Sequence, residues 1–197
     1  MPAAHALTET ERRFLVDADD ARRLVAGLPG LPLVQAYLTN DPDRAVRVRI
    51  GQGAPPRSRT GQAIAWLARL VGRRPSAGAW LTVKGRKAAG AGLEVETDIT
   101  PMQGEALLAI CLGRPVRKRR YILPGTDGLC WEVDLFEDGL TGLVIAEIEI
   151  DRIDRPLALP DWLGPEITDD PRYSNPALAF ADTLPPFYTR PRDATTP

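Results

Sequence analysis

The strongest constraint on this chain is an alternation of period two in which every second residue carries a charge of the same sign. A period of two sends successive side chains to opposite faces of a β-strand. The same-sign groups are Glu9 and Glu11, which precede Arg13; Arg47 and Arg49; Lys84 and Arg86; Glu94 and Glu96; Lys118 and Arg120; Glu132 and Asp134; and Glu147 and Glu149. Apolar residues such as Val48, Val95 and Val133 stand between them. Each segment is therefore predicted to be a strand with one charged face and one apolar face.

Eight segments with this period follow one another without the long crossover connections that parallel strands need. We therefore expect a β-rich α+β fold built on a closed eight-stranded antiparallel β-barrel with peripheral helices. The predicted strands cover residues 8–16, 34–39, 45–51, 79–86, 92–99, 116–123, 129–136 and 143–150.

Three segments between the strands have helical spacing. Residues 18–28 begin with acidic residues, which favour a helix start. A second helix begins near Thr100, and the apolar residues of 107–112 are predicted to give it a buried face. The third helix belongs to an insertion over about residues 53–78. This insertion is expected either to cover the outer wall of the barrel or to restrict entry into it.

The composition fits one domain. The chain has 197 residues, of which 44% are hydrophobic and 26% are charged, so it can bury one substantial core. We assign residues 1–183 to this domain. Residues 184–197 contain several prolines among polar residues and are predicted to form a disordered tail.

Several classes of function are disfavoured by composition. The net charge of −1 provides no general attraction for nucleic acid or for an anionic membrane. The single histidine, His5, nearly excludes histidine-based catalytic triads. No run of about 18 apolar residues and no export signal occurs, which favours a cytoplasmic location. Cys111 and Cys130 lack the spacing of a metal site, and a disulfide between them is not expected.

The sorting of charge suggests a chemistry. Each charged face taken singly is typical of a strand washed by water, but such faces usually mix signs because like neighbours repel. If the charged faces point inward instead, the buried charges need partners or ions. Arginine and lysine bind phosphoryl oxygens, whereas clustered carboxylates hold Mg²⁺ or Mn²⁺. A polyanion together with hard cations would satisfy both sets.

A series of short motifs follows along the chain, beginning with Glu9-Thr10-Glu11-Arg12-Arg13. The later motifs are Gln35-Ala36-Tyr37-Leu38, Arg47-Val48-Arg49-Ile50, Leu81-Thr82-Val83-Lys84-Gly85, Glu94-Val95-Glu96, Arg117-Lys118-Arg119-Arg120-Tyr121, Trp131-Glu132-Val133-Asp134-Leu135-Phe136, residues 142–149 and Trp162-Leu163-Gly164-Pro165-Glu166-Ile167-Thr168. In this order the motifs resemble those of the CYTH superfamily of triphosphate tunnel metalloenzymes, most closely its short bacterial inorganic triphosphatases. The first motif is similar to the ExExK signature of that family, and the resemblance extends to about residue 180.

The resemblance implies a tunnel in which a triphosphate lies beside one or two divalent metal ions, Mg²⁺ or Mn²⁺. It implies metal ligands at Glu9, Glu11, Glu147 and Glu149, with Glu94, Glu96 and Asp134 as further candidates. It implies phosphate-binding residues at Arg47, Arg49, Lys84, Arg86, Lys118 and Arg120. The catalytic residues implied are Glu9 and Glu11 together with a dyad of Arg13 and Tyr37.

Two residues depart from the family pattern. Arg13 occupies the usual lysine position of ExExK, and an arginine cannot release its proton near neutral pH, so only an electrostatic role remains for it. Gly92 stands where many relatives carry an arginine, so one phosphate contact is missing unless Arg86 or Arg172 supplies it.

Several functions remain open at this point. The resemblance favours hydrolysis of inorganic tripolyphosphate. Alternatives are a class IV adenylyl cyclase, a catalytically weakened protein that binds polyphosphate or nucleotide, and an enzyme acting on thiamine triphosphate or another organic triphosphate. The expected partner is a small-molecule triphosphate such as tripolyphosphate or ATP, without nucleic acid or membrane, and a homodimer is one arrangement the sequence allows.

Overall fold

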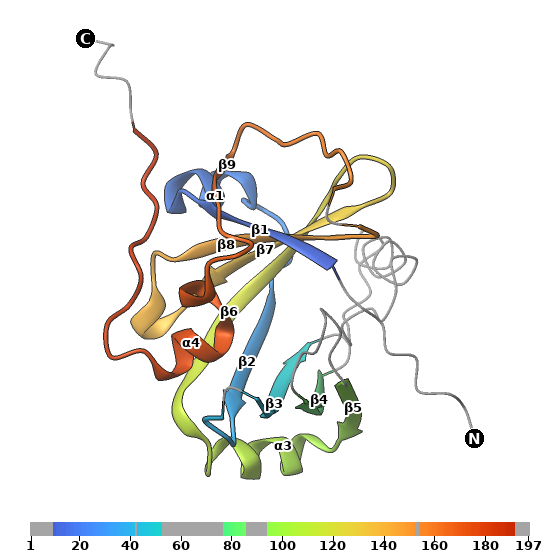
Figure 1. The fold of residues 1–197 in the computed structure, drawn as a ribbon, viewed down its shortest axis with the longest axis vertical. Helices are drawn as coiled ribbons and strands as arrows, with labels where there is room; N and C mark the ends of the chain where they lie inside the picture. The colour runs from blue at the N-terminus through green and yellow to red at the C-terminus, as the bar shows by residue number, and fades with distance from the viewer. Residues whose placement is uncertain (1–9, 42, 53–76, 86–93, 153, 192–197) are drawn as a thin grey trace.

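The computed structural model describes residues 10–41, 43–52, 77–85, 94–152 and 154–191 (Figure 1). The predicted insertion lies almost entirely outside these residues. Within them, antiparallel strands form one sheet. The strands are β1 (Thr10–Val16), β2 (Leu31–Tyr37), β3 (Ala45–Gln52), β4 (Ala77–Lys84), β5 (Glu94–Ile99), β6 (Leu112–Pro124), β7 (Cys130–Phe136), β8 (Val144–Ile150) and β9 (Leu163–Glu166).

The sheet is open, which corrects the prediction of a closed barrel. Its strand order is β5-β4-β3-β2-β6-β7-β8-β1-β9, so β5 and β9 are its two edges within the described residues. The eight predicted strands all exist, although β6 starts at Leu112 rather than at residue 116. The ninth strand, β9, was missed because Leu163–Glu166 is only four residues long and contains a proline. The sheet is strongly curled, and β3 to β5 lie below β1, β7 and β8 (Figure 1).

Short helices fill the connections, and their starts follow the predicted chemistry. In α1 (Ala18–Leu24) the Asp17 carboxylate accepts hydrogen bonds from the first-turn amides. In α3 (Pro101–Leu108) Thr100 and Gln103 form a reciprocal capping box. The remaining helical elements of the described residues are α4 (Asn175–Phe180) and the 3₁₀ turns η1 (Asp138–Leu140) and η2 (Pro171–Tyr173).

The predicted buried face of α3 is wrong. The helix ends at Leu108, and Ile110 is 67% exposed. Its buried residue is Gly104, where an added Cβ would lie 2.8 Å from the Cβ of Ala79 and 3.0 Å from Ile50. The absence of a side chain at Gly104 lets α3 pack closely against β3 and β4, beneath which it lies in Figure 1.

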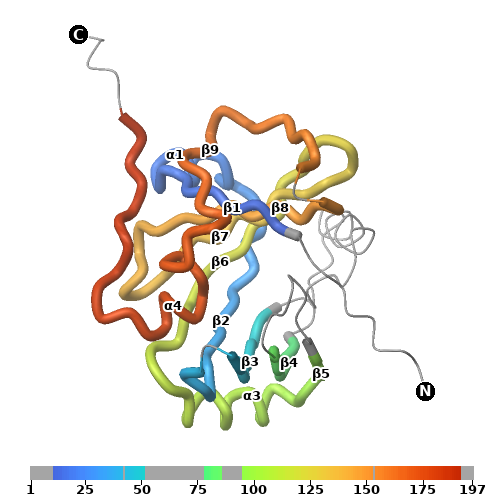
Figure 2. The backbone as a smooth tube through the Cα atoms, in the orientation of Figure 1, coloured from blue at the N-terminus to red at the C-terminus, as the bar shows by residue number. Residues whose placement is uncertain are grey.

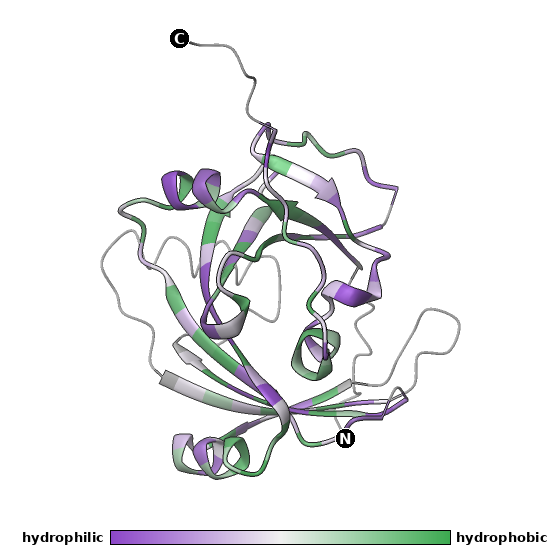
Figure 3. Cartoon of the chain, turned by 90° about the vertical axis from the view of Figure 1, so that its left-hand side faces the viewer, coloured by the Kyte–Doolittle hydropathy of each residue, from purple (hydrophilic) through white to green (hydrophobic). Residues whose placement is uncertain are grey.

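Apolar residues form two clusters on opposite faces of the sheet. On the outer face, Trp131 packs edge-on against Phe14 and Trp162, with ring centroids 5.7 and 5.5 Å away. On the inner face, Leu15, Tyr37, Phe136 and Ile145 pack with residues of α4 at one end of the sheet. Figure 3 shows hydrophilic and hydrophobic residues alternating along the strands, as expected for strands with two different faces.

Residues 184–191 differ from the expectation of a disordered tail. Leu184 and Tyr188 pack on the inner apolar cluster, and the backbone N–H of Arg190 donates to Asp17 at 3.0 Å. The Tyr173 hydroxyl also donates to the carbonyl of Pro186 at 2.7 Å. Figure 2 shows this segment running along the outside of the molecule from α4 past α1. Only residues 192–197 of the predicted tail lie outside the described part.

None of the helices within the described residues combines the length and apolar character needed to cross a membrane.

Replacing Trp131 by alanine tests the outer cluster. Trp131 is 2% exposed and contacts two other aromatic rings, so Trp131→Ala should lower the free energy of unfolding by about 3–5 kcal/mol. Urea denaturation measures this loss. The control Ile110→Ala removes an exposed side chain and should change stability by less than about 0.5 kcal/mol. Equal effects of the two substitutions would contradict the assignment of the core.

Candidate functional site

The strand register brings most of the predicted site residues onto the inner face of the sheet. Directly opposite residues of neighbouring strands project to the same side. Glu11 lies opposite Glu149, and Arg13 opposite Glu147. Glu147 in turn lies opposite Glu132. The other inner-face pairs are Arg120 with Asp134, Leu33 with Lys118, Tyr37 with Arg47, and Thr82 with Glu96.

Three predicted residues cannot be placed. Glu9 and Arg86 lie outside the described residues, and Glu94 is described only as part of the β5 backbone. Gly92 likewise lies outside them.

Two arginines of β3 share one carboxylate. Arg49 donates to Glu96 at 3.3 Å, and the Arg47 guanidinium lies 3.7 Å from the same carboxylate. Arg47 also donates to the Thr82 hydroxyl at 3.2 Å, and the Arg49 guanidinium lies 5.5 Å from the centre of the Trp80 ring. The Nε groups of both arginines are buried without a hydrogen-bond partner. Among the described side chains, this side of the inner face therefore has excess positive charge and unused donors, which an anion would satisfy.

The crowding of these arginines affects their ionisation. Burial, together with the neighbouring charge of Arg47, lowers the pKa of Arg49 to about 10, although Glu96 acts in the opposite direction. Arg49 stays positively charged at neutral pH, but burying this charge beside Arg47 costs electrostatic free energy. A bound anion would reduce that cost.

A network of buried charges occupies the centre of the inner face. Asp134 is fully buried and accepts hydrogen bonds from Lys118 at 2.5 Å and from Arg120 at 2.7 and 2.6 Å. Arg120 also contacts Glu132 and reaches Glu147 at 3.2 Å. Both oxygens of Asp134 are therefore engaged by the two cations.

The carboxylates of this network differ in ionisation. Although burial alone would raise it, Arg120 and Lys118 lower the pKa of Asp134 to about 2. Burial raises the pKa of Glu132, and the opposing charge of Arg120 does not fully offset this effect. Asp134 is thus the fixed counter-ion of Lys118 and Arg120, whereas Glu132 is the more readily protonated carboxylate.

The acidic side of the face lies on β1 and β8. The Glu11 side chain is half exposed. Its partial burial still raises its pKa, and the like charge of Glu147 adds to this effect, while Arg13, Arg120 and Lys84 oppose it. Lys84 belongs to β4, which lies across the curled sheet from β1 (Figure 1). Among the described residues, no group of three acidic, histidine or cysteine side chains is close enough to hold a metal ion. Glu11, Glu147 and Glu149 therefore do not form such a group without the predicted ligands that lie outside the described side chains.

The predicted dyad of Arg13 and Tyr37 is not formed. Within the part of the chain that the structure describes, no hydrogen bond joins them. Arg13 instead donates to the carbonyls of Thr168 and Tyr173. The Tyr37 hydroxyl accepts from Gln35 at 3.3 Å, and burial raises the pKa of Tyr37 to about 12.

Some inner-face residues were missed in the sequence because they are uncharged. Thr82 is fully buried and joins Arg47 to Glu96 by donating to that carboxylate at 2.9 Å. Gln35 is 2% exposed beside Tyr37. Their spacing of two from Lys84 and Tyr37 could have revealed them, since that spacing places them on the same strand face.

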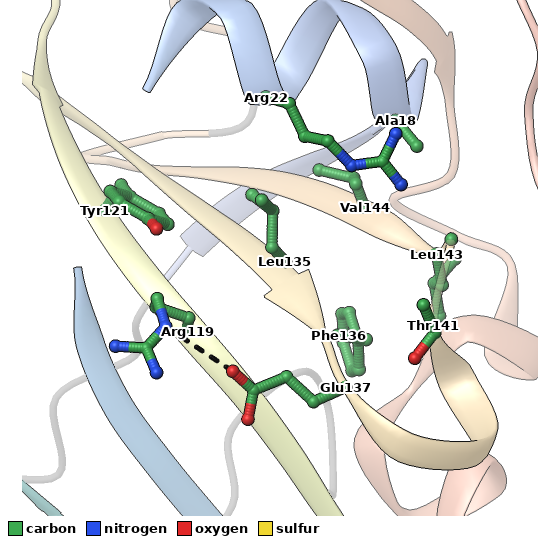
Figure 4. Close-up of a pocket in the computed structure, with 11 residues that line it drawn as sticks. Ala18, Arg22, Arg119, Tyr121, Leu135, Phe136, Glu137, Thr141, Leu143 and Val144 are labelled. Atoms are coloured by element: carbon green, nitrogen blue, oxygen red, sulfur yellow. Dashed lines mark ion pairs between the residues drawn. The ribbon is translucent and has the colours of Figure 1, made fainter. Parts of the chain in front are cut away.

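A cavity of about 210 Å³ lies elsewhere, on the outer face beside α1 (Figure 4). Arg119 and Tyr121 line it, and residues alternating with them on β6, such as Arg120, point to the inner face. Its two arginines already have carboxylate partners, since Arg22 pairs with Asp19 at 2.6 Å and Arg119 with Glu137 at 3.4 Å. This cavity lacks the uncompensated charge found between β3 and β5.

Comparison with known proteins identifies the family, although no family model matches the chain. The chain is 33% identical over 171 residues to an inorganic triphosphatase of Acetivibrio thermocellus, covering 86% of this chain and 92% of that protein. It is 32% identical over 177 residues to an inorganic triphosphatase of Nitrosomonas europaea, covering 89% and 99%. This chain belongs to the CYTH superfamily. A crystal structure of an inorganic triphosphatase matches the fold with a TM-score of 0.55 and 29% identity, covering 90% of this chain and 98% of that one.

These comparisons confirm the resemblance inferred from the sequence motifs. Membership of the CYTH superfamily implies a divalent metal cofactor. The described carboxylates suit such an ion in part, because the oxygen ligands of Glu11 and Glu147 are the kind that hard cations prefer, and their mutual repulsion would be relieved by a cation.

The buried network yields a test of stability. Asp134→Asn should lower the free energy of unfolding at pH 7 by about 3–5 kcal/mol, because Lys118 and Arg120 lose their buried counter-ion. Asp138→Asn is the matched control, since Asp138 is exposed and pairs with Arg117 on the surface, and it should cost less than about 1 kcal/mol. Denaturant unfolding of both variants measures the difference.

The difference in unfolding free energy between wild type and Asp134→Asn should also depend on pH. The pKa of Asp134 is about 2 in the folded protein and about 3.9 in an unfolded chain, so its carboxylate stabilises the fold above about pH 4. That stabilisation is lost as the pH falls through about 2. The gap between wild type and Asp134→Asn should therefore be constant from about pH 5 to 7 and shrink below about pH 4. A gap that widens on acidification would contradict the assigned ionisation.

Proposed function

We propose that this chain hydrolyses inorganic tripolyphosphate on the inner face of its sheet, with Mg²⁺ or Mn²⁺ as the divalent metal. The observation that carries the proposal is the separation of charge on that face. Arg47 and Arg49 share one carboxylate and retain buried unpaired donors, while Glu11 and Glu147 repel each other. A polyanion bound with a divalent cation would neutralise both sides together. The names of the two relatives support the choice of tripolyphosphate.

The phosphate-binding residues proposed are Arg47, Arg49, Lys84, Lys118 and Arg120, with Arg86 added from the sequence. Asp134 holds Lys118 and Arg120 in place, so their charges need little rearrangement when substrate arrives. Arg49 and Arg47 lie across the curled sheet and would contact other oxygens of the same chain of phosphates. We propose that Asp134 orients these cations and does not bind metal, because both of its oxygens already accept hydrogen bonds.

The metal ligands proposed are Glu11, Glu147 and Glu149, with Glu9 and Glu94 from the sequence and Glu96 as a further candidate. These carboxylates would hold the metal ion, which would supply positive charge that neutralises the phosphates. The oxygen ligands fit Mg²⁺ or Mn²⁺. Glu147 also contacts Arg120 at 3.2 Å, so the acidic and basic sides of the site meet at this residue.

The proposed reaction needs little covalent participation by the protein. Water attacks a terminal phosphorus atom, the bond to the bridging oxygen breaks, and orthophosphate and pyrophosphate are formed with release of the water proton. Such transfers depend on in-line positioning and on neutralising charge around the transferred group. The fixed cations Lys118 and Arg120 are suited to that task because they are held by Asp134 before substrate binds.

The alternative functions that the sequence left open would give other results in an assay of product formation. Cyclase action would release pyrophosphate and cyclic nucleotide from ATP, and a binding protein would give no product. No contact among the described residues favours either.

We also propose that the protein acts in the cytoplasm without nucleic-acid or membrane partners. A homodimer remains a prediction, which light scattering after size-exclusion chromatography would test.

Hydrolysis of tripolyphosphate tests the proposal. Purified protein should release orthophosphate from tripolyphosphate only when Mg²⁺ or Mn²⁺ is present. Glu11→Gln and Glu147→Gln should each reduce the rate at least about 100-fold, the scale expected when a preorganised electrostatic contact is lost. The control Glu105→Gln alters an exposed residue of α3 and should keep the wild-type rate. Wild-type rates in both site variants would contradict the proposed metal side of the site.

Tryptophan fluorescence tests the basic side of the site. Because the Arg49 guanidinium lies over Trp80, tripolyphosphate binding should change the Trp80 emission, and Trp80→Phe should remove that change. Arg49→Ala should weaken binding by about 10- to 100-fold through loss of a charge-assisted contact. Arg23→Ala removes an exposed arginine of α1 and is the control. An unchanged dissociation constant in Arg49→Ala would show that the substrate binds elsewhere.

A further inference from the structure

Arg13 lies where the charged and apolar parts of the inner face meet. Glu11 and Leu15 flank it at spacings of two on β1, one in the charged part and the other in the apolar cluster. The Arg13 side chain is only 12% exposed, and its Nε is 3.7 Å from a Glu11 oxygen. A buried arginine at such a boundary needs several acceptors.

The acceptors come from a segment more than 150 residues away in sequence. Arg13 donates through Nη2 to the Thr168 carbonyl at 2.9 Å and through Nη1 to the Tyr173 carbonyl at 3.4 Å. Its backbone N–H donates to the Thr168 hydroxyl at 3.1 Å, and its carbonyl accepts from the Ile167 N–H at 2.8 Å. Side chain and backbone of one residue thus bind the same segment.

That segment, residues 167–180, is here called the C-terminal cover. Ile167, Tyr173 and Leu178 of the cover are buried in the inner apolar cluster. They pack there with Leu15 and Phe136 of the sheet. The cover therefore closes the apolar end of the inner face, next to the charged residues, and Arg13 is the charged residue that attaches it to β1.

We infer that Arg13 is a positioning residue that fixes the C-terminal cover and the neighbouring Glu11, and that it is not the partner of Tyr37. The geometry requires arginine, because one planar guanidinium reaches two carbonyls five residues apart, whereas the ammonium of lysine is a single point charge. Tyr37 instead has its hydroxyl beside Gln35. The effect on catalysis rests on the proposed function, but the attachment of the cover does not.

Hydrogen exchange tests the attachment directly. In Arg13→Lys, the amides of Ile167, Tyr173 and Leu178 should exchange at least about tenfold faster than in wild type, since the cover opens more readily once a contact is lost. Arg172→Lys makes the same change at an exposed arginine within the cover, and should leave these rates unchanged. Arg13→Gln serves as a second variant if Arg13→Lys does not fold. Wild-type exchange in the folded Arg13 variant would overturn the inference.

A double-mutant cycle tests the separation of Arg13 from Tyr37. If they act independently, the rate losses of Arg13→Lys and Tyr37→Phe should multiply in the double variant. Arg13→Lys should also lower the affinity for Mn²⁺ in direct titration, because Glu11 is less well fixed, while Tyr37→Phe should not. A double variant no slower than the worse single variant would overturn the inference by restoring the dyad. Should wild type fail to hydrolyse tripolyphosphate, the exchange rates would still decide the role of Arg13.

Discussion

The structure depends on how charges are compensated on a buried strand face. Asp134 has no exposure to water and lies between two cations, Lys118 and Arg120, which are themselves largely buried. Removing only the carboxylate, or only the cations, would leave an unpaired charge in a region of low dielectric. The register of β6 against β7, which sets Arg120 opposite Asp134, is therefore fixed by charge as well as by apolar packing.

The charges of the inner face are fully paired at its centre but only partly paired towards its sides. Among the described side chains, Arg47 and Arg49 share the single carboxylate of Glu96, while Glu11 and Glu147 repel each other. A protein that needed only stability would pair these groups with one another. Their separation suits a ligand that brings negative charge to the arginines and a cation to the carboxylates.

The sequence predicted the inner face because period two determines the direction of each side chain. That period predicted a common face for Arg47 and Arg49 within their strand, and both guanidinium groups indeed approach Glu96. Closure of the sheet was not predictable, because it depends on pairing between strands distant in sequence, and β5 remains an edge within the described chain. The partners of Arg13 were also hidden, since they are backbone carbonyls of residues 168 and 173, which no side-chain motif reveals. The buried face predicted for α3 failed because close packing at Gly104 outweighed helical spacing.

The most direct test is a crystal structure with Mn²⁺ and a non-hydrolysable analogue of tripolyphosphate. The account predicts an anomalous manganese signal between Glu11 and Glu147, with the analogue's oxygens on Arg49, Lys118 and Arg120. Asp134 should still be bound to its two cations and should have no contact with the manganese. An analogue bound instead in the outer cavity beside Arg22 and Arg119, with no manganese on the inner face, would contradict it.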